Sequence, residues 1–353
     1  MKTKLLIYGA NGYTGALTTR TAVEQGMQPI LAGRHAAKVN ALADELGLER
    51  RIFSLNDPAD IEAALSDVAV VLHCAGPFID TFLPMLQACI QTGTHYLDIT
   101  GEIEVFGEIY TADAQAQAAG VMLMPGVGFD VVPSDCLAAH LKRRLPSATQ
   151  LSLAFLGHGP ARFSRGTART SITNLGQPSY VRRGGKLTPV PHLSKARQID
   201  FGRGPKPAQR VKWGDVFTAY YTTGIPDIEN YIASGGGIIW LLRLARYFTW
   251  LLRSPLLKAA LKPLTRLLPP GPDREQIERS GSVFWGEVVD NEGNSAVSRI
   301  TAPEGYYLTA LASLAIAQKV LDGAAPPGFQ TPAGAFGPDW VLEMEGIARM
   351  DVA

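Results

Sequence analysis

A glycine-rich turn near the start of the chain restricts the fold more than any other feature. The short apolar run Lys4–Tyr8 leads directly into Gly9-Ala10-Asn11-Gly12-Tyr13-Thr14-Gly15. A buried strand that enters glycines spaced by three turns sharply into a helix whose N-terminus faces a phosphate. Such turns also occur without a ligand, but the position at the first strand favours a dinucleotide site. The residues that we expect to form it are Gly9, Asn11, Gly12, Tyr13, Thr14 and Gly15.

The end of the second apolar run indicates which dinucleotide binds. Pro29–Ala32 is followed by Gly33 and Arg34, with no carboxylate at this point. Chains that bind NAD place an acidic residue here to bond the ribose 2′-hydroxyl, whereas the planar guanidinium of an arginine suits a 2′-phosphate. The alternative is a solvated arginine that merely opens the next helix. The sequence predicts NADP as cofactor, with Gly33 and Arg34 as further binding residues.

The first 130 residues or so alternate between strand and helix patterns. The expected strands are Lys4–Tyr8, Pro29–Ala32, Arg51–Leu55, Val68–Cys74, His95–Asp98 and Val121–Met124. The expected helices are Thr14–Gln25, His35–Leu46, Pro58–Leu65, Leu83–Thr92 and Tyr110–Ala119. This alternation predicts an α/β fold with an N-terminal Rossmann domain, a doubly wound parallel sheet that binds ligands at the carboxyl ends of its strands.

The pattern changes after a further expected helix, Ser134–Leu145. Strand-like segments are then separated by connections rich in glycine and proline, and they are expected at Gln150–Leu156, Val216–Tyr221, Gly281–Val289 and Ala296–Thr301. These segments predict a second, mixed α/β domain built on a mostly antiparallel sheet. A long apolar helix is expected at Gly305–Leu321, followed by a loop-like tail. We therefore assign residues 1–135 and 303–353 to the Rossmann domain and 136–302 to a substrate domain.

Three strand ends carry residues that could line a reaction site. Ala75, Gly76 and Pro77 would let a cofactor lie close to the backbone, although a routine turn explains them equally well. Tyr96, Asp98 and Glu102 place a hydroxyl and two carboxylates after the next strand, where they could move a proton or simply cap a helix. Asp130 follows the sixth strand. We predict Tyr96, Asp98, Glu102 and Asp130 as candidate catalytic residues.

The order of these motifs resembles a known family. Gly9–Gly15, Ala32-Gly33-Arg34, Cys74–Pro77, Tyr96–Glu102 and Gly128–Asp135 occur in the sequence that is typical of saccharopine dehydrogenase-like oxidoreductases, in particular the branch of trans-acting enoyl reductases. The resemblance covers about residues 1–145. It implies that the first domain binds a nicotinamide cofactor and that Gly305–Leu321 packs back on that domain. The family spans amino-acid dehydrogenases and lipid-type reductases, and the resemblance transfers no catalytic acid.

Composition excludes some classes of protein and leaves one charge asymmetry. The chain has 353 residues with a net charge of +1. Two segments, Arg182–Lys212 and Tyr231–Pro272, together hold fifteen basic residues and one acid, which is a net charge of +14. Such a concentration predicts an anionic partner. The three cysteines and the histidines show no spacing typical of a disulfide framework or a metal site. With no leader or membrane-spanning run evident, we expect a cytoplasmic protein that binds no metal and no nucleic acid.

One basic, apolar segment stands apart from the rest. Residues 238–268 combine Trp240 and Trp250 with arginines or lysines repeated at helical spacing, and Ser254-Pro255 predicts a second helix that Pro263 interrupts. Such an amphipathic pair could pack on its own domain, dock on an anionic membrane, line an acyl-chain pocket or form a homodimer interface.

These observations lead to one main functional hypothesis. We expect an NADP-dependent oxidoreductase, a reductase acting on an acyl or enoyl lipid-type substrate, such as an acyl thioester, or on another anionic small molecule. Arg162, Arg165, Arg169, Arg182 and Arg183 of the middle domain could hold such an anion. The alternatives are a saccharopine-type amino-acid dehydrogenase and a non-catalytic NADP-binding sensor or membrane-associated scaffold.

Overall fold

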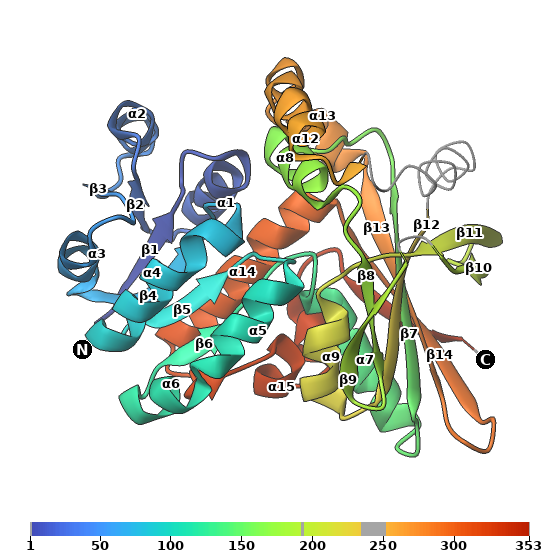
Figure 1. Cartoon of the computed structure of the whole chain (residues 1–353). Coiled ribbons are helices and arrows are strands. Elements are labelled where there is room, and N and C mark those ends of the chain that lie inside the picture. The colour runs from blue at the N-terminus through green and yellow to red at the C-terminus, as the bar shows by residue number, and fades with distance from the viewer. Residues whose placement is uncertain (1, 192–193, 234–251, 353) are drawn as a thin grey trace. The chain divides into compact units, whose positions relative to one another are not determined.

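The structure is a computed structural model that describes residues 2–191, 194–233 and 252–352. It divides into two compact units, one formed by residues 1–132 and 306–344 and the other by 133–305 and 345–353 (Figure 1). The chain therefore passes from one unit to the other three times. The sequence placed residues 303–353 together in the Rossmann domain. Residues 345–353 instead group with the second unit, because their strand pairs with its sheet.

The first unit is built on a parallel sheet, sheet A. Its strands follow the order β15-β6-β5-β4-β1-β2-β3. Their bounds are β1 Lys4–Tyr8, β2 Ile30–Gly33, β3 Arg50–Ile52, β4 Val68–His73, β5 His95–Asp98, β6 Met122–Met124 and β15 Gly328–Phe329. Every pairing between neighbours is parallel. The four apolar residues of β1 are all buried, as expected for a strand covered on both faces. The predicted Rossmann fold is confirmed.

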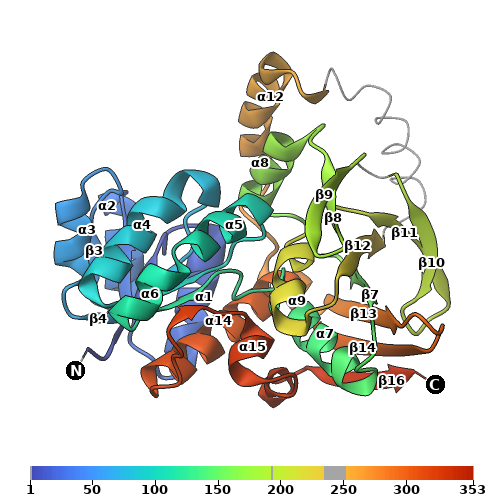
Figure 2. The ribbon, with the colours of Figure 1, turned by 60° about the horizontal axis from the view of Figure 1, so that its bottom comes forward.

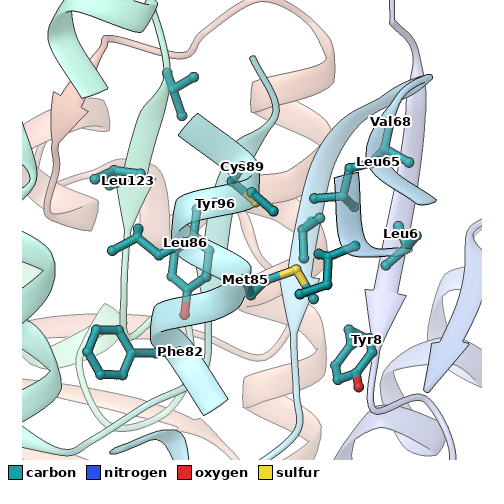
Figure 3. Close-up of a cluster of buried hydrophobic side chains, with 14 of the residues drawn as sticks. Leu6, Tyr8, Leu65, Val68, Phe82, Met85, Leu86, Cys89, Tyr96 and Leu123 are labelled. Carbon is teal, nitrogen blue, oxygen red and sulfur yellow. The ribbon is translucent and has the colours of Figure 1, made fainter. Parts of the chain in front are cut away.

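Helices lie on both faces of sheet A. Their bounds are α1 Tyr13–Glu24, α2 Ala36–Leu46, α3 Pro58–Leu65, α4 Phe78–Thr92, α5 Ile103–Thr111, α6 Asp113–Ala119, α14 Gly305–Leu321 and α15 Pro332–Phe336, with a 3₁₀ turn η3 at Trp340–Glu343. Figures 1 and 2 show α4 and α14 on opposite faces of the sheet. Figure 3 shows part of the core beneath α4, where Phe82, Met85 and Cys89 pack against Tyr96 and Leu123. Helix α14 buries ten residues, which explains its almost wholly apolar sequence.

The second unit is built on a mixed sheet, sheet B, with nine strands among the described residues. The main path is β10-β11-β12-β7-β13-β14-β16, and β8 pairs with both β12 and β9. The strand bounds are β7 Gln150–His158, β8 Ser179–Arg183, β9 Lys186–Val190, β10 Ala196–Asp200, β11 Pro205–Arg210, β12 Asp227–Ala233, β13 Gly281–Val289, β14 Ser295–Pro303 and β16 Ala348–Val352. Only the β12–β7 pair is parallel among these described pairings. The mostly antiparallel sheet is therefore confirmed.

The helices of the second unit complete its architecture. Their bounds are α7 Val132–Arg144, α8 Arg165–Asn174, α9 Asp215–Thr223, α12 Pro255–Leu261 and α13 Arg274–Glu278, with a 3₁₀ helix η2 at Lys262–Leu267. The Ser254 hydroxyl accepts a bond from the Leu257 amide at the start of α12, and the helix gives way to η2 immediately before Pro263. The break predicted at Pro263 is confirmed. The part of the basic amphipathic segment at 238–251, with Trp240 and Trp250, lies outside the described residues.

Several predicted elements are wrong, for reasons visible in the structure. Residues 216–221 form part of helix α9 and not a strand. The helix buries five consecutive residues, 215–219, and Gly224, at φ 68°, ends it. Residues 103–111 form a further helix, α5, and the helix expected at Tyr110–Ala119 begins at Asp113 as α6. The tail is a loop at Pro326 and Pro327, as expected, but beyond them it contains β15, α15, η3 and β16. Strands β8 to β12 lie where glycine- and proline-rich connections were expected.

Candidate functional site in the N-terminal unit

Three strands of sheet A converge at the first glycine of the turn. Gly9 adopts φ 82°, and a Cβ added there would lie 2.8 Å from the Cβ of Ala75, at the end of β4. The amides of Gly9 and Ala10 both donate to the carbonyl oxygen of Ala32 in β2. Only glycine satisfies both the left-handed backbone and the close approach to β4. The turn is thus fixed to the carboxyl ends of β1, β2 and β4.

No side chain caps the N-terminus of α1, so its first-turn amides can bind an anion. A Cβ on Gly15 would lie 2.3 Å from the Gly9 carbonyl oxygen, so only glycine lets α1 start so close to β1. The N-cap is Gly12, which has no side chain to bond the first-turn amides, and the first turn carries no acidic residue. Thr14, half-buried, lies in that turn, and the Tyr13 ring meets Tyr306 of α14 edge-on at 5.0 Å. This arrangement fits a pyrophosphate.

The end of β2 presents the residues predicted to select NADP. Arg34 is exposed, and its positive charge acts to lower the pKa of the Tyr8 hydroxyl, although burial raises that pKa to about 12 overall. The two side chains therefore lie within electrostatic reach of each other. Gly33 lies beneath Asn11, whose Oδ1 would be 3.0 Å from a Cβ at position 33. Asn11, Gly33 and Arg34 thus follow the turn along the same strand ends, where an adenosine ribose would lie.

Glu102 closes the N-terminus of the helix that follows β4. Its two carboxylate oxygens accept bonds from the Phe78 and Ile79 amides, at 3.0 and 3.1 Å, directly after Ala75, Gly76 and Pro77. A carboxylate at this position satisfies two amides that the helix leaves unpaired and interacts favourably with its dipole. The cap also explains why α4 starts at Phe78 and not, as predicted, at Leu83. Glu102 therefore fixes the segment proposed to lie beside the cofactor.

Tyr96 and Asp98 form a buried pair. The Tyr96 hydroxyl donates to Asp98 Oδ2 at 2.8 Å, and Asp98 Oδ1 accepts from the amides of Thr100 and Gly126 at 2.9 and 3.0 Å. Both side chains are fully buried, and burial raises the pKa of Tyr96 and brings that of Asp98 to about 6. The bonds tie the loop after β5 to the loop after β6. Their geometry makes Tyr96 and Asp98 positioning groups of the site.

Asp130 differs from the other three candidates. Its side chain is only partly buried, and removal from water raises its carboxyl pKa to about 7. The carboxylate lies against the backbone of Gly101, where a Cβ would come within 2.3 Å of Oδ2. A carboxyl with a pKa near neutrality exchanges a proton readily at physiological pH. Among the four candidates, Asp130 has the properties of a general acid.

The predicted residues thus meet at one edge of sheet A. Gly9 contacts Ala75, the segment after Pro77 bonds Glu102, and Gly101 contacts Asp130. This series of contacts runs from the glycine turn to Asp130 within a single unit. Parallel strands end at the same edge of a sheet, so the arrangement follows from the topology.

The sequence excluded His73, the last residue of β4, as a metal ligand but assigned it no place in the site. It is fully buried, its pKa falls to about 3 through loss of hydration, and its Nε2 lies 3.0 Å from Thr81 Oγ1. The Thr81 hydroxyl gives its own proton to the Ala75 carbonyl oxygen at 2.7 Å, so His73 Nε2 must be the donor in that contact. His73 is therefore a neutral residue that supports the Ala75 turn. A lone histidine at the end of an apolar strand gave no spacing from which to deduce this.

The second unit holds a small polar niche that was also missed. Ser134 Oγ donates to Asp215 Oδ1 at 2.7 Å, and Asn230 Nδ2 donates to Asp215 Oδ2 at 3.0 Å. Leu153, Phe155, Trp213, Tyr231 and Phe284 line the same niche. Asp215 opens helix α9, which the sequence analysis took for a strand, so the convergence of these groups could not be foreseen.

The described residues offer neither a metal centre nor a membrane-spanning helix. No group of three or more histidine, cysteine or acidic side chains within 2–191, 194–233 and 252–352 is arranged to hold a metal ion. Over the same residues, no helix is both long enough and apolar enough to cross a membrane. The three cysteines Cys74, Cys89 and Cys136 are free thiols.

The fold and the glycine turn define a nucleotide-binding α/β domain at the N-terminus. Residues 5–124 match the family model of the saccharopine dehydrogenase NADP binding domain. This N-terminal part of the chain is therefore similar to the NADP-binding domain of saccharopine dehydrogenases, and the match supports NADP as the cofactor.

Two relatives and one solved structure are similar to the chain. The chain is 24% identical to a saccharopine dehydrogenase-like oxidoreductase of Bos taurus, over 94% of this chain and 92% of the relative. It is 32% identical to a trans-acting enoyl reductase of Mycobacterium ulcerans, but over only 40% of this chain and 36% of that relative. The solved structure of the apo saccharopine dehydrogenase (L-Glu forming) from Saccharomyces cerevisiae shares the fold. Its TM-score is 0.69 at 13% identity, with 99% of this chain and 100% of that chain covered.

Proposed function

We propose that the chain is an NADP-dependent reductase whose substrate is an acyl or enoyl lipid-type molecule, or another anionic small molecule. The observation that carries this proposal is the position of Asp130. A carboxyl with a pKa of about 7 lies at the same strand ends as the glycine turn, in the same unit. Reduction of a polarised double bond needs a hydride and a proton, and Asp130 is suited to supply the proton.

The residues that would hold the cofactor are those of the turn and the β2 end. The open N-terminus of α1 would receive the pyrophosphate, Arg34 the 2′-phosphate, and the Ala75–Pro77 segment the nicotinamide end. NADPH bound there supplies the hydride. Glu102 holds the Ala75–Pro77 segment through α4, and Asp98 holds the loops after β5 and β6. These carboxylates would position the site, and Asp130 would hold and release a proton.

The choice of an acyl or enoyl substrate rests on the likeness to trans-acting enoyl reductases over the N-terminal part. The middle-domain arginines divide into two sets. Arg182 is buried and Arg183 pairs with Glu229, whereas Arg162 and Arg169 are exposed. The exposed pair is better placed to meet an anionic group than the engaged pair.

A saccharopine-type amino-acid dehydrogenase is the second candidate. The likeness to the saccharopine dehydrogenase-like oxidoreductase of Bos taurus runs over almost the whole chain, and the yeast saccharopine dehydrogenase shares the fold. Such an enzyme would form or break a carbon–nitrogen bond and would also need a group that exchanges a proton near neutral pH. Asp130 fits that requirement as well.

Two experiments test the proposal in sequence. Titration of the purified chain should show tighter binding of NADPH than of NADH. Arg34→Asp should reduce NADPH affinity by roughly 10- to 150-fold, which corresponds to about 1.5–3 kcal/mol for a charge-assisted contact. Lys38→Asp, at a neighbouring exposed position, makes the same change of charge and should leave the preference in place. Equal affinities for NADPH and NADH in the unaltered chain would refute the assignment of Arg34.

The second experiment follows NADPH absorbance with panels of enoyl thioesters, acyl thioesters and imino acids. Consumption with an enoyl or acyl thioester supports the reductase, and consumption only with imino acids supports the amino-acid dehydrogenase. Tight NADPH binding without turnover on any panel would favour the NADP-binding sensor.

A further inference from the structure

Two segments that are about eighty residues apart in the sequence form one helical cluster in the second unit. Helix α8 packs against both α12 and η2, and α12 continues directly into η2. Figures 1 and 2 both show α8 beside α12. No residue of α8 or α12 is buried, and Thr265 alone is buried in η2. We call residues 159–178 and 252–272, which contain these helices, the α8–α12 cluster.

The cluster carries only positive charge. Its basic residues are Arg162, Arg165, Arg169, Arg253, Lys258, Lys262 and Arg266, and neither segment contains an acidic residue. The polar bonds of three of them go to backbone carbonyl oxygens, namely Arg165 to Leu268, Arg253 to Gly176 and Lys258 to Thr173. Partial burial and then the like charges of Lys262 and Arg253 lower the pKa of Lys258. The charges are therefore concentrated and not neutralised within the cluster.

The first acid after the cluster, Asp273, caps α13, and the two acids within α13 are engaged in ion pairs. In α13, Glu278 pairs with Arg274 and Glu275 pairs with Arg279, each at i,i+4 spacing. Each acid of these pairs is matched by an arginine of the same helix. The positive field of the α8–α12 cluster is thus preserved up to its C-terminal boundary.

The same cluster exposes the most apolar surface of the described residues. Leu267 is 83% exposed, Leu256 81% and Phe163 68%, which are the three highest values among the exposed large hydrophobic side chains. Leu264 and Leu268 of the cluster are exposed as well. Single exposed leucines are ordinary, but five large apolar side chains within one cluster, three of them on α12 and η2, mark an interaction surface.

We propose that the α8–α12 cluster is a peripheral docking surface for an anionic lipid bilayer. Leucine and phenylalanine side chains inserted at the headgroup boundary, with arginine and lysine around them, are the combination that holds a helix in a membrane interface. A second copy of the chain suits the surface less well, because a two-fold contact would place seven cations against seven cations. The surface goes beyond the proposed reductase activity and does not depend on it.

Vesicle flotation with the full chain tests this surface. Vesicles of phosphatidylcholine with 30% phosphatidylglycerol, roughly the anionic content at which basic residues become effective, should bind the protein at low salt. Vesicles of phosphatidylcholine alone should bind far less, and raised salt should release the protein. Arg169→Gln with Lys262→Gln and Arg266→Gln should reduce partition roughly a hundredfold, at about 1 kcal/mol for each basic residue near the surface.

Matched controls separate the surface from general effects of charge. Lys186→Gln with Arg203→Gln and Lys206→Gln removes the same charge from exposed positions elsewhere in the second unit and should change partition much less. Leu256→Ser with Leu267→Ser should reduce partition at least about tenfold, whereas Leu83→Ser, an exposed leucine of the first unit, should not.

The outcomes decide the proposal. Equal loss with the Lys186, Arg203 and Lys206 variant would show a non-specific attraction and overturn it. A chain that stays with the soluble fraction at low salt would also overturn it. A third outcome would overturn it as well. If sedimentation shows a dimer, and the Leu256 and Leu267 variant dissociates that dimer without changing vesicle binding, the apolar surface belongs to a contact between copies.

Discussion

The carboxylate of Asp130 lies directly against the α-carbon of Gly101. A Cβ placed on Gly101 would come within 2.3 Å of Asp130 Oδ2 and 3.1 Å of its Cγ. The residue type at position 101 therefore controls where the carboxylate of a different loop can lie. This contact gives the carboxylate that we propose as proton donor a fixed position against the backbone.

Gly101→Ala should displace Asp130 without unfolding the chain. The backbone at Gly101 is not left-handed, so alanine is tolerated there, but the Asp130 side chain must rotate away. We expect turnover to fall by about 10²- to 10⁴-fold, as when a general acid is lost, with NADPH affinity unchanged. Gly157→Ala, at a glycine with no atom within 4 Å of its added Cβ, is the control. Unchanged turnover in Gly101→Ala would exclude Asp130 as proton donor.

Asp130 should also make stability depend on pH. Its folded pKa of about 7 lies above the ordinary 3.8, so the folded state holds a proton that the unfolded state has lost. The free energy of unfolding should therefore decrease as pH rises from about 4 to 7. Asp130→Asn should remove this pH dependence. At pH 8 the variant should be more stable than the unaltered chain by on the order of 1–3 kcal/mol in the free energy of unfolding. Urea unfolding at pH 5, 6, 7 and 8 measures it, with Asp322→Asn at an exposed position as control. Identical slopes in the two variants would contradict the raised pKa.

Gly15 and Gly12 should respond differently to alanine. A Cβ at Gly15 meets the Gly9 carbonyl oxygen at 2.3 Å, so backbone must shift, and we expect a loss of about 1–3 kcal/mol in the free energy of unfolding. A Cβ at Gly12 lies 3.3 Å from the same oxygen, so the fold should persist while the pyrophosphate is kept at a distance. Thermal unfolding together with NADPH titration separates the two effects. A Gly12→Ala variant with full NADPH affinity would place the pyrophosphate elsewhere.

Glu229 should govern stability in acid. It is buried in sheet B and pairs with Arg183, Lys195 and Arg210. Burial acts to raise its pKa, but the bond from Lys195 and the other donors lower it to about 2. Its stabilising contribution is therefore present above pH 4.5 and lost as pH falls toward 2.

Glu229→Gln tests this contribution at neutral pH. It should cost about 3–5 kcal/mol, because it leaves the buried Arg210 without its counter-charge. Glu287→Gln, a more exposed partner of Arg197, should cost less than about 1 kcal/mol. Acid titration of the unfolding midpoint provides the comparison, and equal losses in the two variants would contradict the difference in burial.

Arg182 should act through packing and hydrogen bonds. Its guanidinium lies 4.0 Å above the Tyr220 ring and donates to the carbonyl oxygens of Val216 and Gly185. Arg182→Gln should therefore destabilise the second unit by about 2–4 kcal/mol, and Arg182→Lys should recover only part of it, because lysine lacks the planar fork. Lys186→Gln, at an exposed neighbouring position, should be neutral. If Arg182→Lys is as stable as the unaltered chain, the positive charge of Arg182 alone accounts for its contribution.

The sequence predicted the N-terminal sheet well because local chemistry and tertiary contacts agree there. Gly15 must be glycine for α1 to start against β1, so the motif and the contact express one constraint. The β-branched and aromatic side chains of Val216–Tyr221 misled the prediction, since burial against sheet B and the cation–π contact of Tyr220 with Arg182 override strand propensity.

The candidate site could be predicted as a location but not as a set of roles. Strand order places Tyr96, Asp98, Glu102 and Asp130 at one edge. Their roles depend on partners from other loops, such as the Phe78 amide for Glu102 and the Gly126 amide for Asp98. No spacing within the sequence encodes those partners.

The three passages of the chain between units set an order of synthesis. Sheet A has its first six strands once residue 124 is made, but helix α14 on one of its faces, and β15 at its edge, follow only at 305–321 and 328–329. A nascent chain must therefore hold an apolar face of the first sheet uncovered while about 180 residues of the second unit emerge. Folding of the first unit therefore cannot finish before residue 329 has been made, and the apolar surface exposed until then favours aggregation.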